Sequence, residues 1–271
     1  MDELVLLALA MLATGAVGGV LAGLFGIGGG IVIVPALDTA LAFVGTDPAI
    51  RMHVAVATSL ATIVPTSISS ARAHHRRGAD DLELVRRWAF FVLAGALAGA
   101  WFASRVHSDV LSGVFAVVAF LIGVKLLLPL DDKRLADDVP RGAAIVTVPF
   151  AIGGISSVMG IGGGTLSVAA LTLMNQPIHR AVGTAALFGL VISLPGTLGF
   201  VATGWGDPRL PPGSAGFVNL LGFALIAPVT WLTAPAGAAL AHRLSRRQLT
   251  VAFGLFLFLV SLRMLQRAFG S

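Results

Sequence analysis

The pentapeptide Gly-Ile-Gly-Gly-Gly occurs twice, at residues 26–30 and 160–164, and each copy joins one apolar stretch to the next. The sequence before each copy is also apolar and rich in small residues, over residues 15–25 and 149–159. A duplicated hydrophobic segment that glycine interrupts in both halves is the best sequence indication of a transporter's binding site. The repeat therefore predicts a membrane protein made of two related halves.

The composition supports a membrane location. Hydrophobic residues make up 56% of the chain and charged residues 11%, whereas soluble domains carry roughly 25% charged residues. The basic residues are scattered or lie in short connections, so we do not expect a nucleic-acid partner. Cysteine is absent, which excludes disulfides, thiolate metal sites and thiol catalysis.

A membrane-spanning helix needs about 20 mostly apolar residues. Ten segments approach that length, so we expect an all-α, polytopic membrane protein. Segments two and seven are short, and each directly follows a glycine motif. The ten segments are Leu4–Leu24, Ile31–Phe43, His53–Ala71, Trp88–Ser104, Val110–Leu128, Ala143–Val158, Thr165–Met174, Ala181–Thr203, Phe217–Leu240 and Thr250–Leu265.

The repeat unit is expected to comprise five segments. We place the first membrane repeat at residues 1–130, the linker at 131–140 and the second repeat at 141–271. Each half has an odd number of crossings, so the two copies are expected to be inverted relative to each other. This holds whether the first two segments of each half cross fully or form a re-entrant hairpin, and the sequence leaves that choice open.

Lys and Arg predict the orientation, because they concentrate in cytoplasmic connections. They gather after the third, fifth and ninth segments, which alternating crossings place on one side. We therefore expect both termini, and the external loop at residues 205–214, to be periplasmic. The residues are Arg72, Arg76, Arg77, Arg86, Arg87, Lys133, Arg134, Arg141, Arg243, Arg246 and Arg247.

The glycine motifs admit two interpretations, since each glycine in a helix interior costs about 1 kcal/mol. Small residues let membrane helices approach closely, and this is the favoured interpretation for Gly15, Gly19 and Gly23. Alternatively, an unwound turn exposes backbone N–H groups that bind an anion, together with the N-terminus of the next helix. The candidate substrate-binding glycines are Gly26, Gly28, Gly29, Gly30, Gly160, Gly162, Gly163 and Gly164.

Hydroxyl side chains are further candidates, because they bind oxyanion oxygens without placing a charge in the membrane. Thr58 and Ser59 in the first half, and Thr184 with Thr165 and Ser167 in the second, lie on segments that flank the motifs. The alternative, that each bonds a carbonyl of its own helix, is about equally favoured.

Ionisable residues inside spans are functional candidates by default. Asp38 is a candidate for carrying a coupling proton, although a wet position near the external interface is slightly favoured. His53 and Arg180 begin segments from opposite sides and either gate an anion or simply mark helix ends. His74 and His75 belong to a basic connection, where we expect both to be solvated.

No motif of an enzyme is present. The chain has neither His-Glu-x-x-His nor Gly-x-Ser-x-Gly, and the third glycine of a dinucleotide fingerprint is replaced by Ile31 and Thr165. We expect no catalytic residues, no cofactor and no metal.

Taken together, the motifs resemble the sulfite exporter TauE/SafE family of bacterial permeases over nearly the whole chain. The second half departs from the pattern, since Ala169 stands where the first copy has Pro35, and Ala185 where it has Ser59. The resemblance rests on residues 23–37, 55–60, 74–78 with Asp80 and Asp81, 156–164 and 183–185.

The resemblance implies a secondary transporter of small sulfur-containing anions, such as sulfite or organosulfonates. It also implies export across the bacterial inner membrane, linked to the proton gradient. The partners expected are the anionic solute and the lipid bilayer, while the oligomeric state is not predicted. The alternative is a non-transporting membrane scaffold whose glycines serve helix packing only; a channel lacks support, because no ring of like charges occurs.

Overall fold

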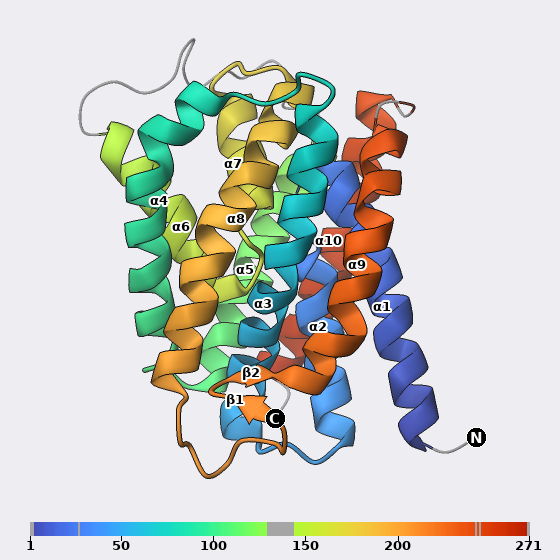
Figure 1. The fold of residues 1–271 in the computed structure, drawn as a ribbon, viewed down its shortest axis with the longest axis vertical. Coiled ribbons are helices and arrows are strands. Elements are labelled where there is room, and N and C mark those ends of the chain that lie inside the picture. The colour runs from blue at the N-terminus through green and yellow to red at the C-terminus, as the bar shows by residue number, and fades with distance from the viewer. Residues whose placement is uncertain (1–2, 27, 129–143, 242, 244, 270–271) are drawn as a thin grey trace.

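The computed structural model describes residues 3–26, 28–128, 144–241, 243 and 245–269 (Figure 1). These residues form a bundle of ten α-helices with one short antiparallel β-hairpin. The elements are α1 (Glu3–Phe25), α2 (Gly30–Phe43), α3 (Pro48–His75), α4 (Leu82–Ala103), α5 (Ser108–Leu127), α6 (Ala144–Met159), α7 (Gly164–Leu173), α8 (Ile178–Thr203), β1 (Ser214–Ala215), β2 (Val218–Asn219), α9 (Leu220–Ala241) and α10 (Arg246–Phe269).

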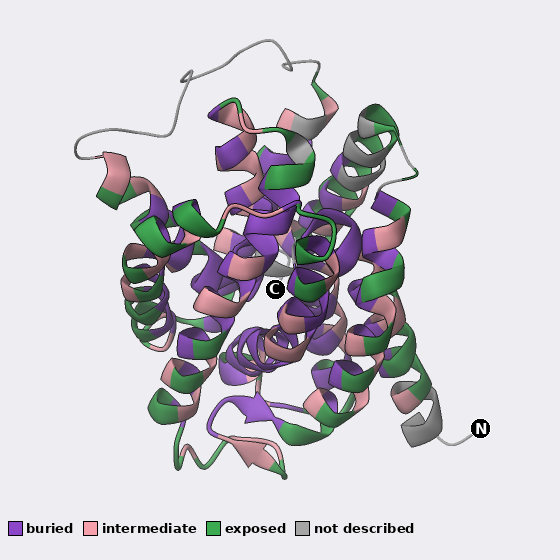
Figure 2. Ribbon diagram, turned by 45° about the horizontal axis from the view of Figure 1, so that its top comes forward, coloured by how far each residue is buried: buried purple, intermediate pink, exposed green. Residues whose placement is uncertain are grey.

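The helices have the length and composition of a polytopic membrane protein, as predicted. Within the described residues six are long and apolar enough to cross a membrane, namely α1, α3, α4, α5, α8 and α9. The helix α10 contains a shorter apolar stretch, Gly254–Gln266. Large apolar side chains such as Phe90, Trp101 and Leu232 are exposed. Figure 2 shows that buried residues fill the centre of the bundle. An apolar exterior of this kind suits a lipid environment.

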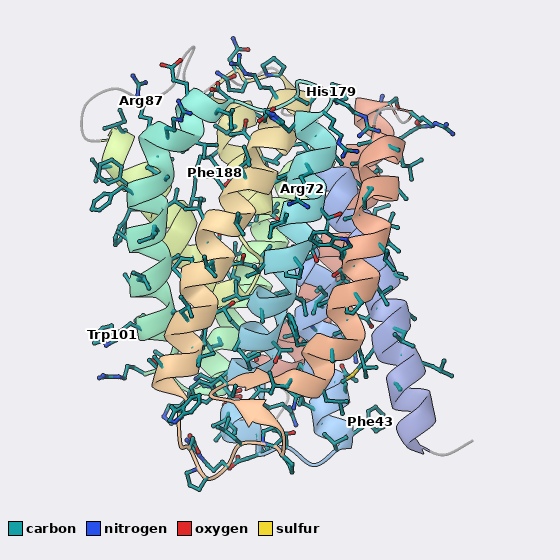
Figure 3. All side chains as sticks on the ribbon, viewed as in Figure 1. Phe43, Arg72, Arg87, Trp101, His179 and Phe188 are labelled. Atoms are coloured by element: carbon teal, nitrogen blue, oxygen red, sulfur yellow. The ribbon has the colours of Figure 1, made fainter. Side chains whose placement is uncertain are left out.

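The first two helices form a hairpin whose two outer ends lie at the same end of the bundle. The helix α1 rises from the lower end of the view in Figure 1, and the imidazole Nε2 of His74, near the upper end of α3, lies 3.0 Å from the carbonyl oxygen of Gly23. The chain then reverses, and α2 returns to the lower end, where Phe43 is labelled in Figure 3. In the second half, α6 enters from the upper end and α7 returns to it (Figure 1). Each half thus begins with a hairpin, and α1 is itself long and apolar enough to cross a membrane.

Each hairpin packs against the fourth helix of the opposite half. The helix α1 lies along α9, and α6 lies along α4. Glycines allow these close approaches: a β-carbon built on Gly19 would lie 2.7 Å from the Cα of Thr230, and one on Gly99 would lie 2.9 Å from the Cα of Gly154. The packing interpretation therefore holds for the glycines inside α1.

Two further contacts pair equivalent helices of the two halves. The helices α3 and α8 pack together, as do α5 and α10. A cation from each fifth helix also reaches the short helix of the other half, Lys125 to the carbonyl of Ala169 and Arg263 to the hydroxyl of Thr39. The pairings match two inverted copies. The linker at 131–140 lies outside the described residues, so the domain limits stay a prediction.

The helices α3 and α4 begin well before the residues that the apolar pattern predicts, His53 and Trp88. Asp47 caps α3, whose first residue is Pro48, and Asp81 caps α4 through a hydrogen bond from the N–H of Leu84. An acidic N-cap, and proline in the first turn, are ordinary helix-start signals. The short hairpin of β1 and β2, which precedes α9, was not predicted.

Candidate functional site

The two glycine motifs form bends with the same backbone conformation. We call residues 26–30 the first bend, of which residue 27 is not described, and residues 160–164 the second bend. A left-handed conformation costs other residues roughly 1–2 kcal/mol each, so the turn itself requires glycine. The φ angles are 66°, 72° and 79° at Gly26, Gly28 and Gly29, and 69°, 63° and 79° at Gly160, Gly162 and Gly163.

The bends meet inside the bundle at one side chain. A β-carbon built on Gly28 would lie 2.7 Å from Cγ2 of Ile63, and one built on Gly162 would lie 2.6 Å from the same methyl group. Gly30 also lies directly against the carbonyl oxygen of Gly160. Ile63 is fully buried and belongs to the middle of α3. The two bends are therefore adjacent, with the Ile63 methyl group between them.

Each bend also contacts the third helix of the opposite half. Gly26 lies against the carbonyl of Val182 in α8, and a β-carbon on Gly160 would lie 3.0 Å from the Cα of Val56 in α3. The motif His-x-Ala-Val-x-Thr occurs at residues 53–58 and again at residues 179–184. Val56 and Val182 occupy the same position in the two copies. The bends are thus held by backbone contacts between the halves.

The short helices α2 and α7 begin at the bends. Their N-caps are Gly29 and Gly163, which offer no side-chain cap to the first turn. The first backbone N–H groups of a helix lack intrahelical partners, and the helix dipole makes this end positive. The N–H of Ser167 is the first in α7 to bond a bend carbonyl, at 2.8 Å from Gly163. Such a helix start can accept an anion.

Of the predicted hydroxyls, the structure brings Ser59 and Thr165 to the second bend. Ser59 donates a 2.8 Å hydrogen bond to the carbonyl of Gly160. Thr165 lies in the first turn of α7, buried and without a partner. Thr58 and Thr184 instead accept the backbone N–H groups of Asn219 and Asp81, at 2.9 and 3.0 Å.

Those two threonines occupy equivalent positions in the two halves. Asp81 accepts the N–H of Leu84 in the first turn of α4, and Asn219 accepts the N–H of Gly222 in the first turn of α9. The threonines thus hold the N-caps of the fourth helices, each in the opposite half. These contacts favour a structural role, and the prediction from the sequence that both threonines are substrate ligands stays untested.

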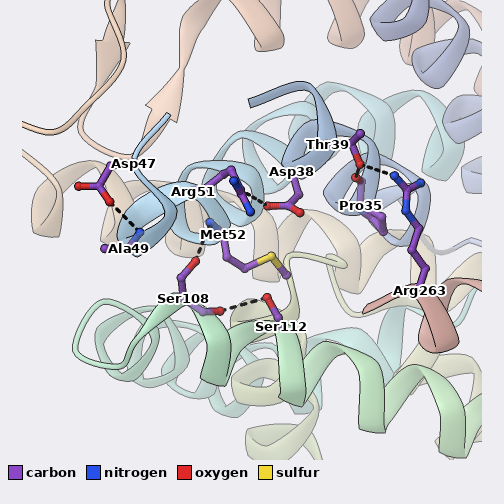
Figure 4. Close-up of polar contacts among 10 residues, drawn as sticks. All are labelled: Pro35, Asp38, Thr39, Asp47, Ala49, Arg51, Met52, Ser108, Ser112 and Arg263. Carbon is purple, nitrogen blue, oxygen red and sulfur yellow. Dashed lines mark hydrogen bonds and ion pairs between the residues drawn. The ribbon is translucent and has the colours of Figure 1, made fainter. Parts of the chain in front are cut away.

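Asp38 does not lie in water. Its side chain is 7% exposed and pairs with Arg51, whose Nε lies 3.2 Å from Oδ1 (Figure 4). The wet position favoured from the sequence is therefore wrong, because the first turn of α3 supplies a cation against α2. Whether this carboxylate moves a coupling proton stays a prediction.

The two gating candidates lie at opposite ends of the bundle. His53 is buried near the start of α3, and its Nε2 lies 3.1 and 3.0 Å from the carbonyl oxygens of Ala103 and Val106. Arg180 begins α8 and pairs with Asp81 at 3.0 Å. The structure does not bring either residue to the bends.

His74 differs from the prediction of a solvated side chain. It is 2% exposed, and its ring approaches the Gly23 carbonyl just before the first bend. His75 is exposed and pairs with Asp80 at 2.8 Å. Adjacent residues on a helix point about 100° apart, so one faces the bundle and the other faces solvent.

The sequence analysis missed several buried hydroxyls near the second bend. Ser156 and Ser157 end α6, and Ser193 lies on α8; none of the three has a hydrogen-bond partner. A signal existed, because the residues before the second motif are two serines where Ala22 and Gly23 precede the first. Among the described residues, no three His, Cys, Asp or Glu side chains gather as metal ligands would.

Comparison with known proteins identifies relatives along the whole length. The model of a family described as sulfite exporter TauE/SafE matches residues 11–264. A "probable membrane transporter protein" of Haemophilus influenzae is 34% identical, over 93% of this chain and 96% of the relative. Another protein of the same description, from Bacillus subtilis, is 24% identical over 96% of this chain and 98% of its own length. No solved structure matches the chain.

Proposed function

The chain belongs to the sulfite exporter TauE/SafE family, and we propose that this membrane transporter carries small sulfur-containing anions, such as sulfite or organosulfonates. Export coupled to the proton gradient is part of the proposal. The family name supports the substrate class, while the names of the relatives support a membrane transporter.

The observation that carries the proposal is the meeting of the two bends. Two turns of left-handed glycines, from halves that enter from opposite ends, meet at Ile63 and direct the starts of α2 and α7 into the bundle. Broken helices that meet inside a transporter commonly bind anionic groups with their N-terminal ends. Non-helical backbone at membrane depth is tolerated where protein or a cavity surrounds it.

Alternating access follows from the exchanged packing of the hairpins. Because α1 packs on α9 and α6 on α4, a movement of either fourth helix shifts the hairpin of the opposite half. Rocking of one half against the other would then separate a bend from Ile63 on one side at a time. In this structure both bends lie against Ile63.

The position of the basic residues supports one orientation of the protein in the membrane. Arg72 and Arg87 are labelled at or near the upper end in Figure 3, and the exposed connection between α3 and α4 carries Arg76 and Arg77. By the positive-inside rule we propose that this end is cytoplasmic and that both termini are periplasmic, in an inner membrane.

The scaffold alternative rests on glycines that serve packing alone. Gly19 and Gly99 do serve packing, but the φ angles of 72° at Gly28 and 63° at Gly162 identify those two as turn residues. Alanine at the bends is therefore strained under either hypothesis, and tolerance of alanine does not separate them. Transport does.

The direct test is uptake of labelled sulfite by proteoliposomes with an imposed pH gradient. We expect saturable uptake that depends on the gradient, and loss of uptake in Gly162→Val. Gly45→Ala is the matched control, because Gly45 has a left-handed φ of 72° with nothing within 4 Å of its β-carbon position. Uptake no faster than in empty liposomes, for sulfite and for alkanesulfonates with folded protein, would exclude the proposal.

A further inference from the structure

Buried hydroxyls without partners are concentrated beside the second bend. Ser156, Ser157 and Ser193 are each at most 1% exposed, and their hydroxyl oxygens have no hydrogen-bond partner. Thr165 and Ser167, in the first turn of α7, are also buried and without a partner. Leaving a buried polar group unpaired costs about 1–3 kcal/mol, so each such group calls for an occupant.

These hydroxyls differ from most other helical hydroxyls of the described residues, although Ser67 and Ser70 on α3 also lack a partner. Thr62, Thr66, Thr172 and Thr197 each donate to a carbonyl three or four residues earlier, at 2.7–2.8 Å. A hydroxyl in a membrane helix ordinarily finds such a carbonyl. The serines beside the second bend make no such hydrogen bond.

Close approaches place these serines against the bend and against α8. The Ser156 hydroxyl lies 3.5 Å from the β-carbon position of Gly163, which is the N-cap of α7. The Ser157 hydroxyl lies 3.0 Å from the β-carbon position of Gly196. Ser193 precedes Gly196 by three residues, so both lie on the same face of α8. Ser156 therefore lies against the start of α7, while Ser157 lies against the face of α8 that carries Ser193.

The first bend provides an internal comparison. In the repeat, Ala22 and Gly23 match Ser156 and Ser157, while Ile31 and Ile33 match Thr165 and Ser167. The backbone is the same, with a left-handed N-cap glycine at φ 79° in both copies. Backbone donors are thus duplicated, whereas the side-chain donors on α6 and α7 occur in one copy only. Ser193 on α8 does have a counterpart, because Ser67 on α3 is also buried and without a partner.

We propose that the oxyanion group of the substrate binds at the second bend alone, held by the hydroxyls of Ser156, Ser157 and Ser193 and by the first backbone N–H groups of α7. The inference rests on the proposed function and adds to it which half binds the anion and through which groups. Neutral donors at a helix N-terminus suit a group with several acceptor oxygens, such as sulfite or a sulfonate. The second half carries the ligands, and the first half closes over them through Ile63 and Ser59.

The test measures binding of sulfite and of ethanesulfonate to purified protein by calorimetry, for Ser156→Ala, Ser157→Ala and Ser193→Ala. A hydrogen bond to a charged group is worth about 1.5–3 kcal/mol, so each variant should weaken Kd about tenfold or more. Ser→Cys at the same positions retains the volume and guards against a packing effect; we expect it to weaken binding as well, because a thiol is a weak donor.

Ser70→Ala is the matched control. Ser70 is also 1% exposed and without a partner, but it lies on α3 at the position that matches Gly196. We expect its Kd to equal that of the wild type. Equal weakening in Ser70→Ala and Ser157→Ala would overturn the assignment to one bend. Unchanged Kd in all three serine variants, as expected if the cluster holds only water, would overturn it too.

The two proposals fail in different ways. If wild-type protein neither binds nor transports either anion, the proposed function fails. If wild-type protein binds and transports them and the serine variants match it, the function stands and the site assignment fails. Gel filtration and unfolding temperature establish that each variant is folded. Removal of an unpaired hydroxyl should leave the elution volume unchanged and should not lower the unfolding temperature.

Discussion

The hydroxyl of Ser59 donates a buried 2.8 Å hydrogen bond to the carbonyl oxygen of Gly160. This bond joins the third helix of the first half to the bend of the second half. Its counterpart is missing in the other direction, because Ala185 occupies the position that matches Ser59. The two halves are therefore related in backbone but differ in how tightly each bend is held.

Ser59→Ala should lower stability by about 1 kcal/mol, the usual net worth of such a bond. The reason is that the Gly160 carbonyl loses its donor in a buried place. The measurement is the unfolding temperature in detergent, compared with Ser70→Ala, which removes a buried hydroxyl that has no partner. Equal unfolding temperatures for the two variants would contradict the assignment.

Substitutions at the bends should be coupled through Ile63. Gly28→Ala and Gly45→Ala meet the same backbone strain, since both glycines have φ of 72°, but only Gly28 has a neighbour at 2.7 Å. Gly28→Ala should therefore destabilise more than Gly45→Ala. Combined with Ile63→Ala, Gly28→Ala and Gly162→Ala should each show a coupling energy of about 1 kcal/mol or more. Additive effects would show that Ile63 does not separate the bends.

The repeated threonines should act on stability and not on binding. Thr184→Val removes the acceptor of the Asp81 N–H and should cost about 1–2 kcal/mol, whereas Thr184→Ser should retain most of the stability. Thr58→Val should behave alike, because Thr58 accepts the N–H of Asn219. Kd for sulfite is expected to stay within about twofold of the wild type, since an N-cap contact lies outside the bends. Weakened binding at unchanged unfolding temperature would instead make the threonines ligands.

The ion pair of Asp38 and Arg51 should hold α2 to α3. Asp38→Asn should lower the free energy of unfolding by about 2 kcal/mol. Breaking a fully buried ion pair costs more, but here the Arg51 side chain is 19% exposed and can be solvated. The double variant Asp38→Asn/Arg51→Gln should recover much of that stability and keep uptake that depends on the pH gradient. A stable double variant without this dependence would make Asp38 the coupling group.

Much of the architecture could be predicted from the sequence, because glycine repeats and apolar lengths are local signals. The all-α membrane fold and the breaks at Gly26–Gly30 and Gly160–Gly164 are confirmed. The partners of Asp38 and His74 could not be predicted, since each is set by packing between helices. The apolar pattern also hid the starts of α3 and α4, although Asp47 and Asp81 are visible caps.

The hydroxyls illustrate a different limit. Sequence alone shows where Ser and Thr occur, but a hydroxyl that bonds its own helix looks the same in sequence as one that does not. Thr197 donates to the carbonyl of Ser193, whereas the hydroxyl of Ser193 itself has no partner. Only the three-dimensional arrangement separates these two neighbours.

The most direct measurement of the central claim is counterflow of labelled sulfite in proteoliposomes preloaded with unlabelled sulfite. A carrier with one anion site that faces each side in turn exchanges bound anion, so preloading should accelerate uptake of the label, and the acceleration should saturate with concentration. Uptake that preloading leaves unchanged, and that rises linearly with concentration, would contradict the account.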